Sequence, residues 1–425
     1  MEVYDFIGIG FGPANLSVAV AMSERSMIDQ NSKIIFIESK TDFVWHDGML
    51  LPEAEMQISF FKDLVTLRNP TSSFSFINYL SENNRLEAFA NLKRFFPRRI
   101  EYNDYLKWAA KKFDNYVRYG KKVLKIEPVI NDDSEIIEYL ALHIQDVTTG
   151  KEEILYTKDV SLATGINKKI PEYVISNPDI KIIHSNDFLN SLEENFTEKD
   201  LEYKFLIVGS GQSAAEITLH LADKYPKSRI NLCFRNYALK PADETEFVNE
   251  IFGSETVKTF LTYENDFRKN IFEKHRDTNY SVVDPELISV LYERLYYQKL
   301  IKNEQIKINR FLELQGICED SKNAIFKDLT NNKKTQFEFD ALFLAIGYEI
   351  TASSIIKNCE DYLVYDLEGR LVLDENYMVE KVSKDFKPKI FIQGASEHSH
   401  GMSETLLSLL AYRSGKITDR LIENT

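Results

Sequence analysis

Lys62 and Asp63 stand together between two short apolar runs, in the stretch AEMQISFFKDLVTLRNP (54–70). An ammonium group is costly to bury alone, so this lysine must reach solvent, pair with a carboxylate of the protein, or meet an anionic group of a ligand. Asp63 and Glu55 are the nearest carboxylates in the sequence, and spacing alone favours a local ion pair with one of them. What Lys62 does therefore depends on the residues around it.

A glycine-rich turn follows the first apolar run, with Gly8, Gly10 and Gly12 ahead of Pro13. Glycine at the first two positions lets the backbone approach a pyrophosphate, which then lies at the N-terminus of the next helix. Glu38 ends the following apolar run and can accept hydrogen bonds from both ribose hydroxyls. Proline takes the place of the third glycine, and Glu38 lies further from the turn than is usual. The pattern predicts a site for FAD or NAD.

A second glycine turn contains Gly209 and Gly211, and the strand after it is followed by Arg235 instead of an acid. Arginine cannot accept a hydrogen bond from a ribose hydroxyl, but its guanidinium group binds a 2′-phosphate. NADPH is therefore the predicted ligand, with Ser210 and Ser213 as further candidates for its contacts. The alternative interpretation of Arg235 is a solvated surface arginine.

Two dinucleotide sites in one chain predict electron transfer from NADPH to a flavin. The reduced flavin needs an acceptor, and the three cysteines, Cys233, Cys318 and Cys359, form no CxxC pair. This spacing argues against a disulfide relay, a disulfide framework and a zinc knuckle. Molecular oxygen is the remaining natural acceptor, and no metal site is predicted.

The charge and composition of the chain limit its partners. Its 425 residues carry a formal charge of -14, and 44% of them are hydrophobic. Nucleic acid is not expected to bind, because phosphate contacts need a concentrated basic surface. The N-terminus has no basic leader, and no apolar run approaches the ~20 residues that span a bilayer. We expect a cytoplasmic protein that binds neither nucleic acid nor membrane.

Two similar strand–turn–helix segments, at residues 4–24 and 203–223, must position these groups. Both match the βαβ unit that binds dinucleotides. The expected fold is α/β, with two Rossmann-like dinucleotide-binding domains, for FAD and NADPH, one inserted in the other, and a small helical substrate-binding region. The expected boundaries are 1–170 and 340–425 for the FAD-binding domain, 200–240 and 283–339 for the NADPH-binding domain, and 241–282 for the substrate-binding segment.

Six segments resemble the microbial N-hydroxylating flavin monooxygenases, and among these they most resemble the L-ornithine N-monooxygenases of siderophore biosynthesis. They occur in the family's order and cover nearly the whole chain: MQISFFKDLVTLRNPTSSFSFINYL (56–80), FPRRIEYNDYLKW (96–108), VGSGQSAAE (208–216), FVNEIF (247–252), TNYSVV (278–283) and HGMSETLLS (400–408). The strand LAIGY (344–348) departs from the family at Ile346, where threonine is usual.

The resemblance implies that NADPH reduces FAD, that oxygen adds to form a hydroperoxyflavin, and that its distal oxygen is transferred to the terminal amine of L-ornithine. It implies that Lys62 pairs with the substrate α-carboxylate and that Asn249 holds the same end. Asn279 and Ser408 would lie near the reacting amine. In this family the protein positions the substrate and excludes water while the flavin carries the oxygen chemistry. The family also implies a homotetramer.

The remaining site residues follow from the same resemblance. The implied catalytic residues are Gln57, Asn279 and Ser408. The implied FAD contacts are Gly8, Gly10, Gly12, Pro13, Glu38, Trp45, His46, Met56, Gln57 and Leu407. The implied NADPH contacts are Gly209, Ser210, Gly211, Gln212, Ser213, Arg235, Asn279 and Tyr280. Ordinary packing is the alternative interpretation for Met56, Gln57, Trp45 and His46.

Two alternative functions stay open. L-Lysine or a diamine, such as putrescine or cadaverine, would undergo the same chemistry. Lysine is one methylene longer than ornithine, a difference of only ~1–3 kcal/mol in a pocket, and a diamine has no carboxylate for Lys62. A non-hydroxylating flavoprotein redox module would use NADPH only to set the flavin's oxidation state, and would need no residues that grip an amino acid.

Overall fold

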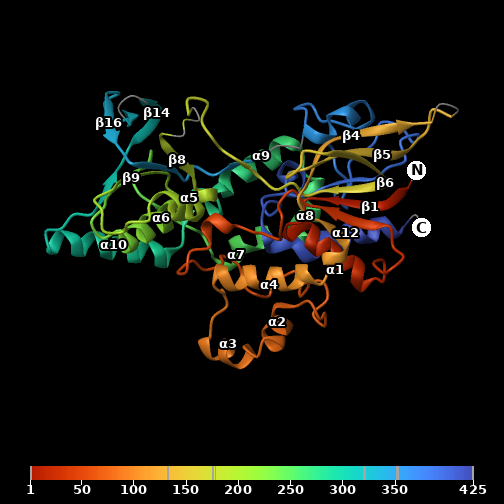
Figure 1. The fold of residues 1–425 in the computed structure, drawn as a ribbon, viewed down its shortest axis with the longest axis horizontal. Helices are drawn as coiled ribbons and strands as arrows, with labels where there is room; N and C mark the ends of the chain where they lie inside the picture. Colours follow the sequence, from red (N-terminus) through yellow and green to blue (C-terminus); the bar gives the residue numbers. More distant parts are fainter. Residues whose placement is uncertain are drawn as a thin grey trace.

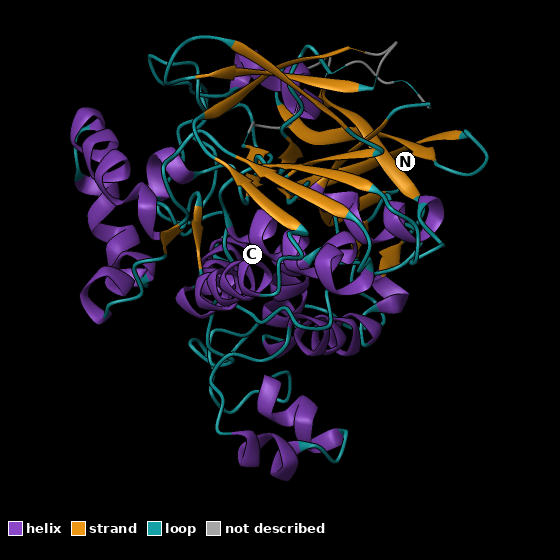
Figure 2. Cartoon of the chain, turned by 90° about the vertical axis from the view of Figure 1, so that its left-hand side faces the viewer, coloured by secondary structure: helices purple, strands orange, loops and turns teal. Residues whose placement is uncertain are grey.

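The chain folds into two α/β domains, each built on its own sheet (Figure 1). The computed structural model describes residues 2–131, 134–174, 177, 179–318, 322–350 and 354–423. In Figure 1 the first domain, with both ends of the chain, lies on the right and the second domain on the left. The view turned by 90° shows most helices gathered below and beside the strands (Figure 2).

The first sheet has the strand order β3-β2-β1-β6-β5-β4, and β19 also pairs with β6. Strand β1 runs parallel to β2 and β6, whereas β4, β5 and β6 form an antiparallel meander. The strands are β1 (Val3–Ile9), β2 (Ile34–Ile37), β3 (Val117–Arg118), β4 (Lys121–Ile130), β5 (Ile137–Asp146), β6 (Glu152–Leu162) and β19 (Ile390–Ile392). Strand β1 is nearly all apolar because parallel strands are covered on both faces.

The second sheet is entirely parallel, with the order β13-β10-β9-β17-β8. Its strands are β8 (Lys181–His184), β9 (Lys204–Val208), β10 (Arg229–Cys233), β13 (Ile306–Asn309) and β17 (Ala341–Leu344). A three-stranded antiparallel sheet follows β13 and consists of β14 (Leu312–Cys318), β15 (Asn323–Asp328) and β16 (Lys334–Glu338). Two short pairs complete the strands: β7 (Asn167–Lys168) with β18 (Tyr348–Glu349), and β11 (Lys240–Pro241) with β12 (Val282–Val283).

Most helices lie below and beside the sheets (Figure 1). The α-helices are α1 (Pro13–Glu24), α2 (Phe76–Glu82), α3 (Leu86–Leu92), α4 (Arg99–Lys111), α5 (Phe188–Asn195), α6 (Gln212–Lys224), α7 (Glu246–Asn249), α8 (Ser254–Thr262), α9 (Asn265–His275), α10 (Pro285–Leu300), α11 (Glu397–His400) and α12 (Leu410–Ile422). Of these, α2, α3 and α4 form a lobe at the lower centre of the view (Figure 1). The 3-10 helices are η1 (Asp47–Met49), η2 (Asp114–Tyr116), η3 (Ser185–Asp187), η4 (Glu250–Phe252), η5 (Arg276–Thr278), η7 (Ser354–Tyr362) and η8 (Leu407–Leu409). None of the helices in the described ranges is long and apolar enough to cross a membrane.

The predicted α/β fold with one domain inserted in the other is confirmed, because the chain leaves the first sheet after β6 and returns to it at β19. The boundary expected at residue 340 needs correction. Strand β17 pairs with β9 and β8 in the second sheet, and β8 joins that sheet before residue 200. The apolar run DALFLAIGY does not show which of two parallel sheets it joins, since buried strands of both sheets have the same composition.

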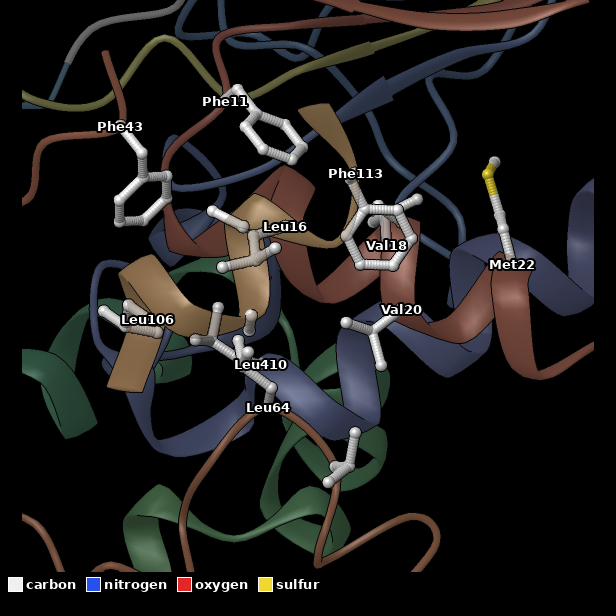
Figure 3. Close-up of a cluster of buried hydrophobic side chains, with 14 of the residues drawn as sticks. Phe11, Leu16, Val18, Val20, Met22, Phe43, Leu64, Leu106, Phe113 and Leu410 are labelled. Atoms are coloured by element: carbon white, nitrogen blue, oxygen red, sulfur yellow. The ribbon is translucent and has the colours of Figure 1, made fainter. Parts of the chain in front are cut away.

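Helix α1 is the centre of the first domain's largest core (Figure 3). Leu16 and Val20 of α1 are fully buried and pack with Leu64, with Leu106 of α4 and with Leu410 of α12. Segments far apart in the sequence thus meet on one helix. The burial of these side chains fixes the chain just after Lys62 against the first domain.

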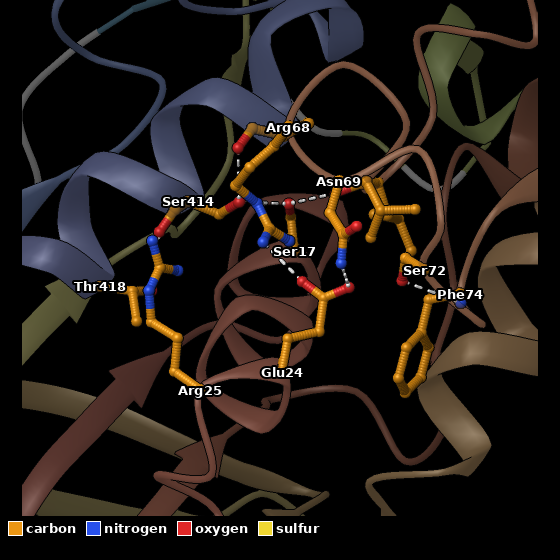
Figure 4. Close-up of polar contacts among 12 residues, drawn as sticks. Ser17, Glu24, Arg25, Arg68, Asn69, Ser72, Phe74, Ser414 and Thr418 are labelled. Carbon is orange, nitrogen blue, oxygen red and sulfur yellow. Dashed lines mark hydrogen bonds and ion pairs between the residues drawn. The ribbon is translucent and has the colours of Figure 1, made fainter.

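A set of polar contacts joins the same segments (Figure 4). The hydroxyl groups of Ser17 and Ser414 lie 2.8 Å apart between α1 and α12. Arg68 forms an ion pair with Glu24 at 2.5 Å, and the amide of Asn69 donates to the same carboxylate at 3.1 Å. Residues 64–69 are therefore held to α1 by both apolar and polar contacts.

Asp63 organises the turn that carries Lys62. Its side chain is 2% exposed and accepts hydrogen bonds from the backbone N–H groups of Val65, Thr66 and Phe76, at 2.9, 2.6 and 2.8 Å. The Thr66 hydroxyl donates a fourth bond at 2.8 Å. One buried carboxylate thus joins the Lys62 turn to the start of α2, as buried carboxylates do when backbone donors replace water.

We expect the substitution Asp63→Asn to lower the free energy of unfolding by about 2–3 kcal/mol, because it removes charge-assisted bonds and points an amide donor at backbone donors. Urea denaturation followed by circular dichroism measures this change. Asp266→Asn, at an exposed position of α9, is the matched control. Equal stability of Asp63→Asn and the wild type would contradict the role of this carboxylate.

Candidate active site

Two adjoining cavities contain most of the residues that the sequence singles out. The larger cavity has a volume of about 580 Å³ and follows the second glycine turn. The smaller cavity has a volume of about 280 Å³ and includes Lys62. The two share one wall, formed by Gln57, Gln212, Ser213, Asn279, Val282, Tyr348 and Thr405. A group held in one cavity therefore lies next to a group held in the other.

Lys62 lines the smaller cavity without an ion pair. The local pair favoured by spacing is wrong, because Asp63 is used by backbone donors, and Glu55 pairs with Arg94 and Arg98 at 2.5 and 3.5 Å. Within the described ranges, the Lys62 ammonium forms no ion pair with a carboxylate, and it lies 6.0 Å from the centre of the Phe252 ring. Burial lowers the pKa of Lys62. A half-buried cation that lacks a partner is suited to an anionic group of a ligand.

The other predicted substrate residues line the same cavity. Asn249 comes from α7, and its side-chain amide donates to the Glu244 carbonyl at 2.9 Å. Asn279 lies in the wall shared with the larger cavity, and Ser408 is buried on η8. With Lys62, the structure therefore brings together three parts of the chain that are more than a hundred residues apart, namely residue 62, residues 249–279 and residue 408.

The residues predicted near the flavin ring lie in one place. Trp45, His46, Met56, Gln57 and Leu407 all line the smaller cavity. The rings of Trp45 and His46 meet edge to face, with centroids 4.9 Å apart. The cavity is thus bounded by aromatic and apolar groups on the side of the first domain.

The first glycine turn lies outside the lining of both cavities. A Cβ atom on Gly10, whose φ is +81°, would lie 2.3 Å from the Ala163 carbonyl oxygen, so this position excludes a side chain. Space is open at Gly12, directly before α1, where backbone N–H groups can bind an anion. The Glu38 carboxylate faces this turn and accepts from the Phe11 N–H at 2.7 Å. These residues fit the pyrophosphate and ribose of a dinucleotide.

The second glycine turn and the other predicted NADPH contacts line the larger cavity: Gly209, Ser210, Gly211, Gln212, Ser213, Arg235, Asn279 and Tyr280. A Cβ atom on Gly209, whose φ is +147°, would lie 2.1 Å from the Ala345 carbonyl oxygen. Arg235 is 72% exposed, and its only ion pair in the described part of the chain is a loose one with Glu313, at 3.8 Å. Its guanidinium group is therefore available to a phosphate in this cavity.

Sequence reasoning missed a polar network that connects the cavities. The Asp284 carboxylate accepts from the side-chain amides of Gln57 and Gln212, at 3.0 and 2.8 Å. Gln212 also donates to Glu216 at 3.0 Å, and Glu216 pairs with Arg99 at 2.8 Å. The signal for Asp284 was present, because an acid directly before proline is typical of a helix start. Gln57, expected beside the flavin, is thus also tied to the second domain.

An acidic group also faces the smaller cavity and was not predicted. Glu244 lines this cavity together with Lys62. Burial, followed by the nearby charges of Asp284 and Glu286, raises the pKa of Glu244. One cavity thus contains an unpaired ammonium group and a carboxylate whose charge is disfavoured. No cluster of three or more His, Cys, Asp or Glu side chains that could hold a metal occurs in the described ranges.

His46 is expected to make stability depend on pH. Burial, and then the charge of Arg99, lowers the pKa of His46 from 6.5 to about 4. The unfolded chain then binds more protons than the folded chain between pH 4 and pH 6.5, so this contribution is complete above pH 6.5 and is lost as the pH falls to 4. Urea unfolding at several pH values should show a weaker dependence for His46→Gln than for the wild type. His275→Gln, at an exposed position, serves as the control; equal slopes for all three proteins would contradict the expectation.

Comparisons with known proteins agree with this geometry. A family model described as L-lysine 6-monooxygenase/L-ornithine 5-monooxygenase matches residues 2–350. An L-ornithine N(5)-oxygenase from Arthrobotrys oligospora is 39% identical over 439 residues, which cover 99% of this chain and 88% of the relative. An ornithine N-hydroxylase from Kutzneria sp. 744, in a complex named for reduced FAD, NADP+ and L-ornithine, has a TM-score of 0.92 and 33% identity, with 100% of both chains covered.

A solved L-lysine 6-monooxygenase from Pseudomonas syringae is less similar, with a TM-score of 0.83 and 27% identity over 98% of this chain and 99% of that one. The family model matches most of the chain, and the Arthrobotrys relative matches nearly all of it. This chain therefore belongs to the L-lysine 6-monooxygenase/L-ornithine 5-monooxygenase family.

Proposed function

We propose that this protein is an FAD- and NADPH-dependent monooxygenase that hydroxylates the side-chain amine of L-ornithine for hydroxamate siderophore biosynthesis. In the balanced reaction, the amine, O₂, NADPH and a proton give the hydroxylamine, NADP+ and water. One observation carries the proposal. Lys62 has no ion pair in the described ranges and lines a cavity that shares a wall with the expected NADPH cavity.

The two glycine turns support the choice of cofactors. Gly10 and Gly209 leave no room for a side chain, and each turn is followed directly by a helix N-terminus. Glu38 would accept from the ribose of FAD, and Arg235 would bind the 2′-phosphate of NADPH. Bound FAD would supply the redox chemistry that delivers one oxygen atom to the amine.

The charges in the smaller cavity favour an amino acid over a diamine. Lys62 would pair with the α-carboxylate, and Asn249 would donate to the same end. Glu244 would accept from the α-ammonium group. A zwitterion therefore satisfies both a cation and an anion of the protein, whereas a diamine would leave Lys62 facing a second positive charge.

The reacting amine must be neutral to act as a nucleophile, although a free alkylammonium has a pKa of about 10.4. The cavity would favour the neutral form, because burial disfavours a charged amine and Lys62 adds a like charge. Asn279, in the wall between the cavities, would orient the amine towards the cofactor. Ser408, which lines the same cavity, would lie near the reacting amine.

Ornithine is proposed over lysine because the ornithine-acting relatives match more closely, at 39% and 33% identity against 27%. The first experiment measures hydroxylamine and NADPH oxidation with L-ornithine, L-lysine and putrescine, each with FAD and oxygen. Product mainly from ornithine supports the proposal. Product mainly from lysine or putrescine would reassign the substrate, and peroxide without hydroxylamine in every case would favour a redox module.

The homotetramer and the cytoplasmic location remain predictions, the first to be checked by light scattering.

We expect Lys62→Met to raise the KM for L-ornithine by about 10- to 100-fold, because a charge-assisted bond to the carboxylate is lost. The KM for putrescine should stay the same or fall. Steady-state kinetics with both substrates measures the difference, and Lys107→Met, at an exposed position of α4, is the control. A similar change of KM for both substrates would contradict the assigned partner of Lys62.

We expect Arg235→Ser to raise the KM for NADPH by about 10- to 100-fold and to leave the KM for NADH unchanged, because only NADPH carries the 2′-phosphate. Arg229→Ser changes an exposed arginine at the start of β10, the strand that Arg235 follows, and is the matched control. Initial rates measured with NADPH and with NADH give the two KM values. An unchanged preference for NADPH would contradict the phosphate contact and show that Arg235 is a solvated surface residue.

A further inference from the structure

Tyr280 lies in the short loop between η5 and β12. The N–H groups of Asn279 and Tyr280 both donate to the Arg276 carbonyl, at 3.3 and 2.9 Å. Ser281 adopts a φ of +62°, which is rare for a residue with a side chain. The following strand, β12, has only two residues and pairs with the two residues of β11. The position of Asn279 in the cavity wall therefore needs support from outside the loop.

That support comes from the C-terminal segment. The Tyr280 hydroxyl donates a hydrogen bond to the Glu397 carboxylate. The Thr405 hydroxyl donates to the same carboxylate oxygen at 3.0 Å and lies 3.2 Å from the Tyr280 hydroxyl. The Tyr280 ring also rests near Phe272, with centroids 6.2 Å apart. One carboxylate thus joins the loop of Asn279 to the segment that leads to Ser408.

The triad of Tyr280, Glu397 and Thr405 lies where it can hold the cavity walls together. Tyr280 and Glu397 line the larger cavity, and Thr405 lines both cavities. Asn279 and Ser408 both line the smaller cavity, and the bonds among Tyr280, Glu397 and Thr405 directly join the two segments that carry them. If the triad is broken, the two walls can separate, so water enters and the substrate is held less well.

The expected protonation of Tyr280 and Glu397 agrees with a hydrogen bond from the phenol to the carboxylate. Burial, followed by the charge of Glu397, raises the pKa of Tyr280 above its usual value, so the phenol keeps its proton and donates. Burial also raises the pKa of Glu397, while the two donated bonds favour its charged form. Arg276 faces the same ring at 6.0 Å and Glu404 lies near Glu397, so charges of both signs surround the triad.

We infer that Glu397 is a positioning residue that, through Tyr280 and Thr405, fixes the Asn279 loop against the C-terminal segment and so sets how much of the consumed NADPH yields hydroxylated amine instead of peroxide. This inference rests on the proposed function. Glu397 lines the larger cavity but not the smaller one, so its effect on the substrate passes through the Asn279 loop and the C-terminal segment. Nothing in the sequence distinguishes this acid from the others, because its partner lies more than a hundred residues away.

The test compares Tyr280→Phe, Glu397→Gln, Glu397→Ala and the double variant Tyr280→Phe/Glu397→Ala. Each is assayed for the KM of L-ornithine, for kcat and for the ratio of hydroxylamine to NADPH consumed. Loss of one hydrogen bond to a charged group should raise the KM about tenfold and lower the ratio at least twofold. Glu397→Gln, whose amide oxygen still accepts, should fall between the wild type and Glu397→Ala. The double variant should be no worse than the stronger single variant, because both single substitutions remove the same hydrogen bond between Tyr280 and Glu397.

Matched controls lie on the exposed face of α10, where Tyr292→Phe and Glu293→Gln make the same chemical changes at residues outside both cavities. FAD content and melting temperature are measured for every variant. Wild-type KM and coupling in Tyr280→Phe and Glu397→Ala would overturn the inference, and so would a loss of activity that merely follows a loss of FAD. Strictly additive effects in the double variant would also overturn it. If the wild type itself makes no hydroxylamine from ornithine, the proposed function fails instead.

Discussion

The largely buried ion pair between Arg99 and Glu216 joins the two domains, whose relative position shapes both cavities. Arg99 begins α4 of the first domain, and Glu216 lies on α6 of the second. Burying two charges is costly unless their remaining hydrogen-bonding positions are filled. Here Arg99 also donates to the Met49 carbonyl at 2.7 Å, and Glu216 also accepts from Gln212. A satisfied pair of this kind favours one arrangement of the domains over others, because any shift leaves a charge buried without a partner.

The smaller cavity shows the opposite principle, since its charges are left without partners. Asp63 is next to Lys62 in the sequence, but its carboxylate accepts hydrogen bonds from backbone N–H groups instead of pairing with Lys62. Lys62 and Glu244 line one cavity and form no ion pair with each other. Both charges are therefore disfavoured in the free protein, and a zwitterion of the right length would stabilise both at once. Affinity and selectivity would then come from the same two groups.

Much of this architecture could be predicted from local patterns. The glycine turns, the acid at Glu38 and the placement of Arg235 follow from spacing within one βαβ unit, where the backbone itself fixes the geometry. The placement of Lys62 in a cavity came from a resemblance, because spacing alone favoured a local ion pair. Asp284 and Glu397 were missed because their partners lie far away in the sequence. Glu244 was missed because only the fold brings it into the cavity of Lys62. The sheet of β17 was also missed, since a buried parallel strand reads the same in either sheet.

The insertion of one domain in the other also determines the order in which the protein can be completed during synthesis. Strand β6 ends at Leu162, but its neighbour β19 begins only at Ile390, and α12, which packs on α1, follows later still. The second domain has all of its strands by β17, so it can fold while the first sheet still has an open place beside β6. A ribosome that stops shortly before β19 would therefore release a chain with a finished second domain and a first domain that exposes a hydrophobic strand edge, which is a target for chaperones and for aggregation.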